Sequence, residues 1–293
     1  MTENNNYQQL TRTFQRLSRF SHLAAIAGWD MFAMMPPGGS RARGEALAEL
    51  GVLQHQILTD KKVGEWLRHA LQEDLNDLEQ ANLREMTRQY QQAALLPESL
   101  VEAKSLAGNR CEHAWRSQRP ANDWQGFAEN LCEVVKLSRE EAQIRAEAKG
   151  CSRYDALLDI FEPDMTSARL DVLFADLKSW LPSLLANVVD KQAQKTLLEP
   201  QGPFAIADQR ELGLEAMRVL GFDFDGGRLD ISAHPFCGGV PEDVRITTRY
   251  NENDLLSALF GVIHETGHAR YEQNLPRNWV DQPVGLARST AIH

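Results

Sequence analysis

Near the carboxyl end of the sequence, two histidines stand four residues apart, with a glutamate directly after the first. They are His264 and His268, with Glu265 between them, in the stretch ALFGVIHETGHARYEQ at 258–273. Residues four apart on a helix share one face, about 6 Å apart along the axis, so both imidazoles can bind one zinc ion. Glu265 lies beside the pair, where a general base can reach an activated water. The predicted chemistry is metal-assisted hydrolysis of a peptide bond.

The structural alternative is a helix that merely carries two partly buried histidines. Histidine is scarce, at 8 of 293 residues, so a chance match to this pattern is roughly a one-in-a-hundred event on composition. The motif also lies beside an apolar helix face and follows a short β-branched run, and zinc peptidases align a substrate backbone in that arrangement. The position of the motif therefore favours a zinc site.

A zinc site of this kind needs a third protein ligand. One known extension of the motif places a glycine and a further histidine on its carboxyl side. Tyr271 stands where that glycine would be, and Asn274 stands where that histidine would be. The sequence therefore does not belong to that class, and the ligand must be sought elsewhere.

On the carboxyl side of the motif, three residues are candidates for the third ligand. Glu272 lies two turns from His264, about 12 Å along the axis, so it would have to bend back toward the metal. Asp281 is in the loop sequence PRNWVDQP, where nothing around it marks it as a ligand. His293, the last residue, is the remaining candidate inside the chain.

Composition excludes several functional classes. The 41 acidic and 31 basic residues give a net charge of −10, so there is no basic surplus for a nucleic-acid partner. The polar start MTENNNYQQL is unlike a secretory signal. The sequence contains no run of eighteen apolar residues, so it does not predict a membrane partner. We expect a cytoplasmic protein. The four cysteines form no CxxC pair, which predicts reduced thiols in packed positions.

The first 220 residues predict a mainly α fold of long antiparallel helices. Apolar residues recur at helical spacing from 7 to 27, and this helix is expected to end at Gly28, before a Pro-Pro-Gly-Gly loop. Strong helix formers fill 46–92. Gly150 suits a left-handed helix end, and Thr166 or Ser167 suits a helix start.

A small β-sheet is predicted within residues 221–252. The β-branched run 245–250 is the stronger candidate strand, and 228–232 is the weaker one. Asn251 or Asn253 is expected to cap the final helix, 253–274, which carries the histidine pair. Without repeats or flexible linkers, we treat 1–293 as one helical unit.

Four residues in the sheet region are candidates for contact with substrate or with the metal ligands. Asp243, Arg245 and Thr247 alternate along a strand and would share one face. They could fix the edge of the cleft, or an Asp-Arg pair could simply brace the sheet. His234 precedes a proline and could reach a substrate carbonyl or an oxyanion, or it could form a purely structural hydrogen bond.

Several segments resemble those of the carboxypeptidase Taq, or thermostable carboxypeptidase, family of zinc metallocarboxypeptidases. HPF at 234–236, DVRIT at 243–247 and HETGH at 264–268 occur in the order of that family. WDMFAMMPPGG at 29–39 and YDALLDIFEPDMT at 154–166 are also similar to family segments. The resemblance extends over essentially the whole chain. It implies a mostly helical enzyme, commonly a homodimer, that uses zinc, or another divalent metal such as cobalt, to release residues from a free carboxyl end.

The resemblance also implies where the third ligand lies. In the family it is the glutamate of a His-Glu-Ser motif, after a segment similar to VGLARSTAIH at 284–293. By that alignment His293 is the histidine of the motif, and the ligand would be the next residue. The resemblance therefore implies a single incomplete peptidase domain, lacking the carboxy-terminal part of the family domain, with activity impaired.

Two rival interpretations remain open. A related helical oligopeptidase would cut peptides internally and would accept substrates with an amidated carboxyl end. Alternatively, the chain is an inactive fragment or a helical interaction protein that retains the motif. Zinc content and release of terminal amino acids would separate these interpretations.

Overall fold

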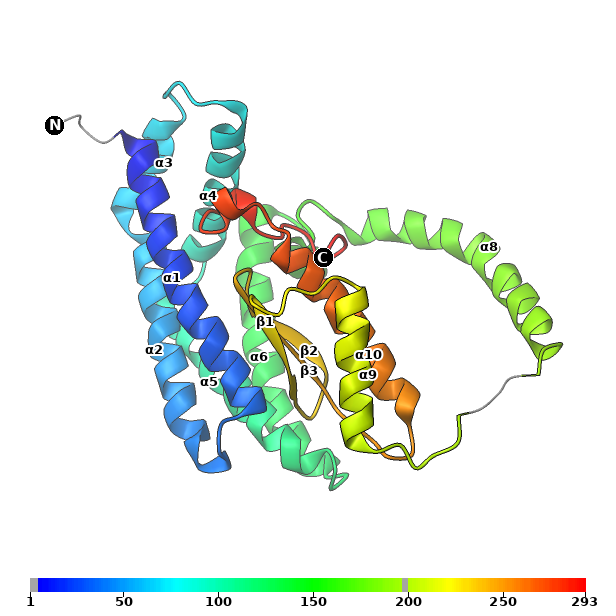
Figure 1. The fold of residues 1–293 in the computed structure, drawn as a ribbon. Helices are drawn as coiled ribbons and strands as arrows, with labels where there is room; N and C mark the ends of the chain where they lie inside the picture. Colours follow the sequence, from blue (N-terminus) through cyan, green and yellow to red (C-terminus); the bar gives the residue numbers. More distant parts are fainter. Residues whose placement is uncertain (1–4, 197–199) are drawn as a thin grey trace.

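The computed structural model describes residues 5–196 and 200–293, and the described chain is mainly helical (Figure 1). A small sheet lies between the amino-terminal helices and the last two helices. The helices are α1 Asn6–Ala33, α2 Ser40–Thr59, α3 Lys61–Ala70, α4 Asp77–Ala94, α5 Glu98–Gln118, α6 Trp124–Lys149, α7 Arg153–Phe161, α8 Ser167–Ala193, α9 Ile206–Val219 and α10 Leu255–Gln273.

Several helix ends follow the local sequence, and one does not. Gly150 adopts a left-handed conformation with φ 66° after α6, and the Thr166 side chain accepts a hydrogen bond from the Arg169 backbone N–H at the start of α8. The expected end of the first helix at Gly28 is wrong, because α1 continues to Ala33. Trp29 and Met31 are buried beyond that glycine, so their packing outweighs the modest helix penalty of glycine.

Helices α1 to α6 form the amino-terminal bundle. One core joins α1, α3 and α4, where Leu10 and Met86 are completely buried and Phe14, Val63 and Leu67 pack around them. Helix α5 packs against both α2 and α6. Burying such side chains stabilises the fold by about 1.5–3 kcal/mol each. The bundle thus holds the carboxyl end of α1 firmly beside the sheet.

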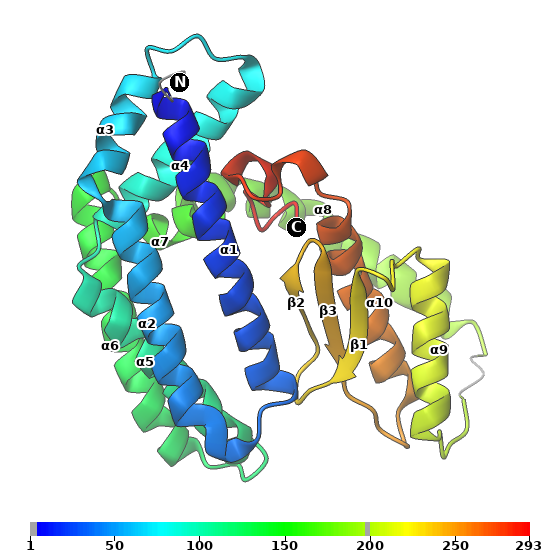
Figure 2. The ribbon, with the colours of Figure 1, turned by 60° about the vertical axis from the view of Figure 1, so that its left-hand side comes forward.

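The sheet has three strands, β1 Gly227–Ile231, β2 Phe236–Val240 and β3 Asp243–Thr248. β3 is central, parallel to β1 and antiparallel to β2. Both predicted strands are therefore present, and β2 was not predicted. The sheet lies between α1 on one side and α9 and α10 on the other (Figure 2). A second core, which includes Met217, Ile246 and Val262, joins this sheet to those two helices.

Helix α8 extends away from the rest of the described chain as a curved arm (Figures 1 and 2). None of its residues is buried, although Phe174, Leu177, Trp180 and Leu184 are among its many large apolar side chains. The sequence contains no run of eighteen apolar residues, yet α8 is long and apolar enough to cross a membrane by length and composition alone. Helices that pack against other protein meet the same two criteria.

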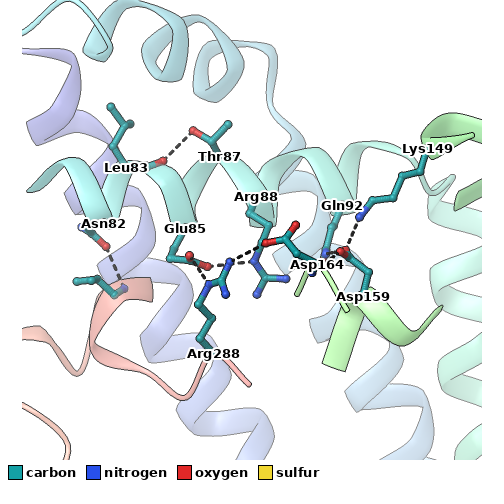
Figure 3. A network of polar contacts seen from close by, with 11 residues as sticks. Asn82, Leu83, Glu85, Thr87, Arg88, Gln92, Lys149, Asp159, Asp164 and Arg288 are labelled. Atoms are coloured by element: carbon teal, nitrogen blue, oxygen red, sulfur yellow. Dashed lines mark hydrogen bonds and ion pairs between the residues drawn. The ribbon is translucent and has the colours of Figure 1, made fainter. Parts of the chain in front are cut away.

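Residues 275–293 after α10 form a segment that we call the strap. Gln282 of the strap donates to the Thr11 carbonyl at 3.1 Å, and the Val284 backbone N–H donates to Asn82 Oδ1 at 3.2 Å. Arg288 reaches Glu85 of α4 at 2.7 Å and Asp164, three residues beyond the end of α7, at 3.6 Å. Figure 3 shows the contacts of Arg288 with Glu85 and Asp164, which tie the strap to α4 and to the segment after α7.

The four cysteines form no disulfide in the structure, and only some of them are packed. Cys111 is buried and Cys237 is half-buried. Cys132 and Cys151 are exposed, so the expectation of packed positions is wrong for these two.

Candidate metal centre

Helix α10 positions the histidine pair. Its first backbone amides are capped by Asp254, whose side chain accepts from the Ser257 N–H at 3.0 Å. The expected caps Asn251 and Asn253 precede this residue and are wrong. The expectation failed because Asn and Asp are both good caps, so residue type alone does not select the first residue of the helix.

The two histidines lie together on the outer face of α10. Val262, Thr266 and Ala269 are buried on the sheet side, whereas His264 is exposed and His268 is half-buried. The two imidazole ring centroids are 4.9 Å apart with an interplanar angle of 84°. The structure therefore brings the predicted ligand pair into one place, as the four-residue spacing requires.

Glu265 is buried beside strand β2. Its side chain is 7 % exposed, and its charge affects the neighbouring Cys237. Burial, followed by the charges of Glu265 and Glu272, raises the pKa of the Cys237 thiol to about 12. Glu265 therefore lies between the histidine-bearing face and the sheet. A general base held in this way has limited contact with bulk water.

Two of the three candidates for the third ligand converge near the pair. The His293 ring stacks on His268 at 4.9 Å, with an interplanar angle of 26°. His293 Nε2 lies 2.9 Å from Glu272 Oε1, which is ion-pair distance, but the pair lacks hydrogen-bond geometry. Asp281 instead accepts a hydrogen bond from Gln15 of α1 at 2.6 Å. The structure thus brings His293 and Glu272 to the centre and holds Asp281 at the bundle.

The surroundings of Glu272 shift the pKa of its carboxyl group. Burial raises the pKa of its carboxyl group, and the nearby imidazoles of His293 and His268 lower it. The distance from Glu272 to His264 was the only reason to expect that Glu272 would have to bend back toward the metal. The four-residue spacing from His268 places Glu272 on the same helix face, and this signal was present in the sequence.

The residues present fit a divalent transition metal in part. Two imidazoles on one helix face suit zinc, and the buried His293 Nε2 beside them has no hydrogen-bond partner in the described chain. Within residues 5–196 and 200–293, however, no group of three His, Cys, Asp or Glu side chains is arranged to hold a metal ion. His264 and His268 could therefore supply two ligands, and the described residues do not place a third beside them.

Two of the other predicted site residues, Asp243 and Arg245, lie in strand β3. Asp243 accepts from the Arg245 guanidinium through both oxygens, at 2.8 and 2.6 Å. Hydrogen bonding from Arg245 lowers the pKa of Asp243. The Arg245 guanidinium lies 4.6 Å from the Trp29 ring centroid. This geometry favours the bracing interpretation, because the pair holds α1 against the sheet.

Thr247 lies in strand β3, and His234 lies in the link between β1 and β2. The Thr247 hydroxyl is buried, shares a hydrogen bond with the Ser232 hydroxyl at 2.7 Å and accepts from the Phe236 N–H at 3.1 Å. His234 is exposed, and its carbonyl accepts from the Ser232 hydroxyl at 2.6 Å. Thr247 therefore has a structural role, whereas the His234 imidazole is open to solvent.

The fold and the site define a class, the mainly helical metallopeptidases with a metal-binding helix beside a small sheet. The sequence matches the "Carboxypeptidase Taq (M32) metallopeptidase" family over residues 9–293, and the chain belongs to that family. The resemblance inferred from the motifs is thereby confirmed, as is the mainly α fold class.

Relatives and solved structures agree with this membership. The chain is 36 % identical to Thermostable carboxypeptidase 1 of Thermus thermophilus, across 100 % of this chain and 60 % of that protein. It is 33 % identical to Carboxypeptidase 1 of Bacillus subtilis, across 95 % of this chain and 56 % of that protein. The structure of Trypanosoma cruzi metallocarboxypeptidase 1 matches with a TM-score of 0.85 and 47 % identity, across 97 % of this chain and 58 % of that one. The chain spans about three-fifths of the length of these proteins.

Proposed function

We propose that this chain provides the metal-binding part of a zinc carboxypeptidase that releases single residues from the free carboxyl end of peptides. The observation that carries the proposal is the pair His264 and His268 on the outer face of α10, with Glu265 buried beside them. Family membership supports it, because the similar proteins are named carboxypeptidases. Substrates, zinc as the metal and a homodimeric assembly in the cytoplasm all belong to this proposal.

The mechanism assigns distinct roles to these residues. His264 and His268 would hold the ion, which when bound polarises a peptide carbonyl and favours deprotonation of water. Glu265 accepts the proton of the attacking water and passes it to the leaving amine nitrogen. The sheet side of Glu265 is closed by Cys237, whose raised pKa keeps it a neutral thiol. As a neutral thiol, Cys237 does not compete with Glu265 as a base for that proton.

A matched pair of variants tests the proposal. We expect zinc to bind the unaltered chain, His264→Ala to abolish stoichiometric zinc, and Glu265→Gln to retain zinc while losing hydrolysis. Plasma emission measures zinc, and amino-acid release from blocked dipeptides measures hydrolysis. Absence of zinc from the unaltered chain, or equal zinc in His264→Ala, would contradict the metal assignment.

Substrates with a modified carboxyl end distinguish the carboxypeptidase from an internal oligopeptidase. Amidation should prevent cleavage by a carboxypeptidase, whereas an oligopeptidase should cut amidated peptides as well as free ones. Sedimentation of the same preparation measures assembly, for which we expect a dimer.

A second candidate is a helical interaction protein without activity. The exposed apolar residues of α8 favour it, because a patch of this kind normally contacts another protein or a membrane surface. In addition, no group of three side chains among the described residues is arranged to hold a metal ion. This alternative predicts neither zinc nor amino-acid release in the assays above.

A further inference from the structure

A cleft with an apolar half and a basic half lies between the end of α5 and the sheet. Its apolar half is a cavity of about 460 Å³ lined by aromatic side chains, and its basic half is a cavity of about 470 Å³ lined by arginines. The aromatic residues are Phe32, Trp115 and Phe236, and the arginines are Arg116, Arg119 and Arg249. Trp115, Arg116 and His234 line both cavities, so the two cavities adjoin each other. We call them together the amphipathic cleft.

The cleft lies beside the histidine-bearing face of α10. Pro235, next to His234 in the chain, comes within 3.7 Å of the position that a Cβ of Gly261 would occupy. Gly261, His264 and His268 are spaced by three and four residues, so they share one face of the helix. Gly261 precedes His264 by about one turn, roughly 5 Å along the axis. The amphipathic cleft is therefore about one turn beyond the histidine pair.

The charge of the basic half is incompletely neutralised. Arg116 is fixed by a bidentate pair with Glu112, at 2.9 Å for both contacts, and donates to the Met31 carbonyl at 2.6 Å. Arg119 and Arg249 are exposed, and neither forms an ion pair among the described residues. Two unpaired cations at one cavity repel each other unless an anion binds between them. In a chain of net charge −10, this is a local reversal of sign.

The shape of an arginine side chain narrows the choice of anion. A guanidinium binds a carboxylate through two parallel hydrogen bonds. The adjoining aromatic cavity would take an apolar side chain at the same time. A ligand that fits both halves therefore carries a carboxylate and a bulky apolar group a short distance apart, as adjacent side chains of a peptide do.

We propose that the amphipathic cleft binds the amino-side part of a peptide substrate that carries an acidic side chain next to a bulky apolar one. The proposal rests on the carboxypeptidase function above. Only one substrate residue lies on the carboxyl side of the bond that such an enzyme cuts. A cleft one turn beyond the histidine pair therefore contacts residues on the amino side of that bond, and it selects among peptides by their upstream sequence.

The test compares two peptides that differ only in charge, acetyl-Phe-Asp-Ala-Ala and acetyl-Phe-Asn-Ala-Ala. Binding to the full chain is measured by titration calorimetry, with each peptide as the free acid and as the carboxyl amide. We expect the Asp peptide to bind about tenfold more tightly in both forms. The double variant Arg119→Gln with Arg249→Gln should reduce this preference to about twofold or less. Added sodium chloride should weaken the preference in the unaltered chain.

The control variant is Arg110→Gln, which removes an exposed arginine from the same helix outside the cleft. It should leave the preference unchanged, and thermal melting should show that all variants fold. Equal binding of the two peptides, or an equal loss in Arg110→Gln, overturns the proposal. A preference that depends on the free carboxyl end and not on Asp also overturns it, because the arginines would then bind the terminus.

Binding and catalysis are measured separately, so the two proposals can fail separately. If the chain prefers the Asp peptide but has neither zinc nor hydrolytic activity, the proposal for the cleft stands and the proposed carboxypeptidase function is refuted. If the chain shows zinc-dependent hydrolysis but no preference for the Asp peptide, the proposed carboxypeptidase function stands and the proposal for the cleft is refuted.

Discussion

Replacing Asn82 with alanine should release the strap from the bundle and lower the free energy of unfolding. Asn82 is fully buried and donates to Tyr7 Oη at 3.1 Å and to Gln282 Oε1 at 3.2 Å, while its Oδ1 accepts from the Val284 N–H at 3.2 Å. These distances are near the long end of the usual range, so we assign each bond about 0.5–1 kcal/mol. The sum, with the cost of unpaired buried partners, is about 2–3 kcal/mol.

The expected shift in melting temperature follows from chain size. An unfolding entropy of about 2.1 cal/mol/K per residue gives roughly 0.6 kcal/mol/K for 293 residues, so Asn82→Ala should lower the melting temperature by about 4 °C. Calorimetry measures this shift, and limited proteolysis should cut the strap first. Asn130→Ala is the matched control, because Asn130 donates only to Gly126 within its own helix. Equal melting temperatures of the two variants would contradict this prediction. So would a strap that resists proteolysis in Asn82→Ala as well as it does in the unaltered chain.

Two further predictions concern thiol reactivity and acid stability. At about pH 8, iodoacetamide should alkylate the exposed Cys151 and spare Cys237, whose pKa burial raises to about 12; equal labelling by mass spectrometry would contradict this. Asp243→Asn should lower the urea midpoint near neutral pH, because hydrogen bonding from Arg245 depresses the pKa of Asp243 in the folded state. A depressed pKa gives stability that is present above the unfolded value of about 3.9 and is lost as pH falls through the folded value, so the difference in midpoint should narrow below about pH 4. A constant difference across that range would refute the assignment.

The sequence predicted the elements whose signals are local. The spacing of His264 and His268 was enough to place both rings together on a helix, and Gly150 marked a helix end. Strand β2 was missed because its sequence, FCGGV, lacks the alternation that identifies a half-buried strand. It forms through pairing with β3, which is a tertiary interaction that a local pattern does not encode.

The remaining differences also arise from contacts that are distant in sequence. His293 reaches Glu272 only because the strap folds back along the bundle. The buried side chains around Trp29 carry α1 past Gly28, although glycine weakens helices locally. The periodicity of α8 predicted a helix, but the same apolar stripe is compatible with burial or exposure. Its exposed position in the described chain follows from the absence of packed neighbours there.

The strap has a consequence for the order in which the molecule assembles during synthesis. Its contacts join Thr11 and Gln15 to residues 271 and 266 positions later. At about 5–20 residues per second, a ribosome needs roughly 13–55 s to make the intervening chain. Once α4 has been made, α1 and α4 must stay associated until the strap provides the partners of Asn82. A segment translated about 270 residues later therefore fixes the first helices in place, and a pause before that segment is made would prolong the vulnerable state.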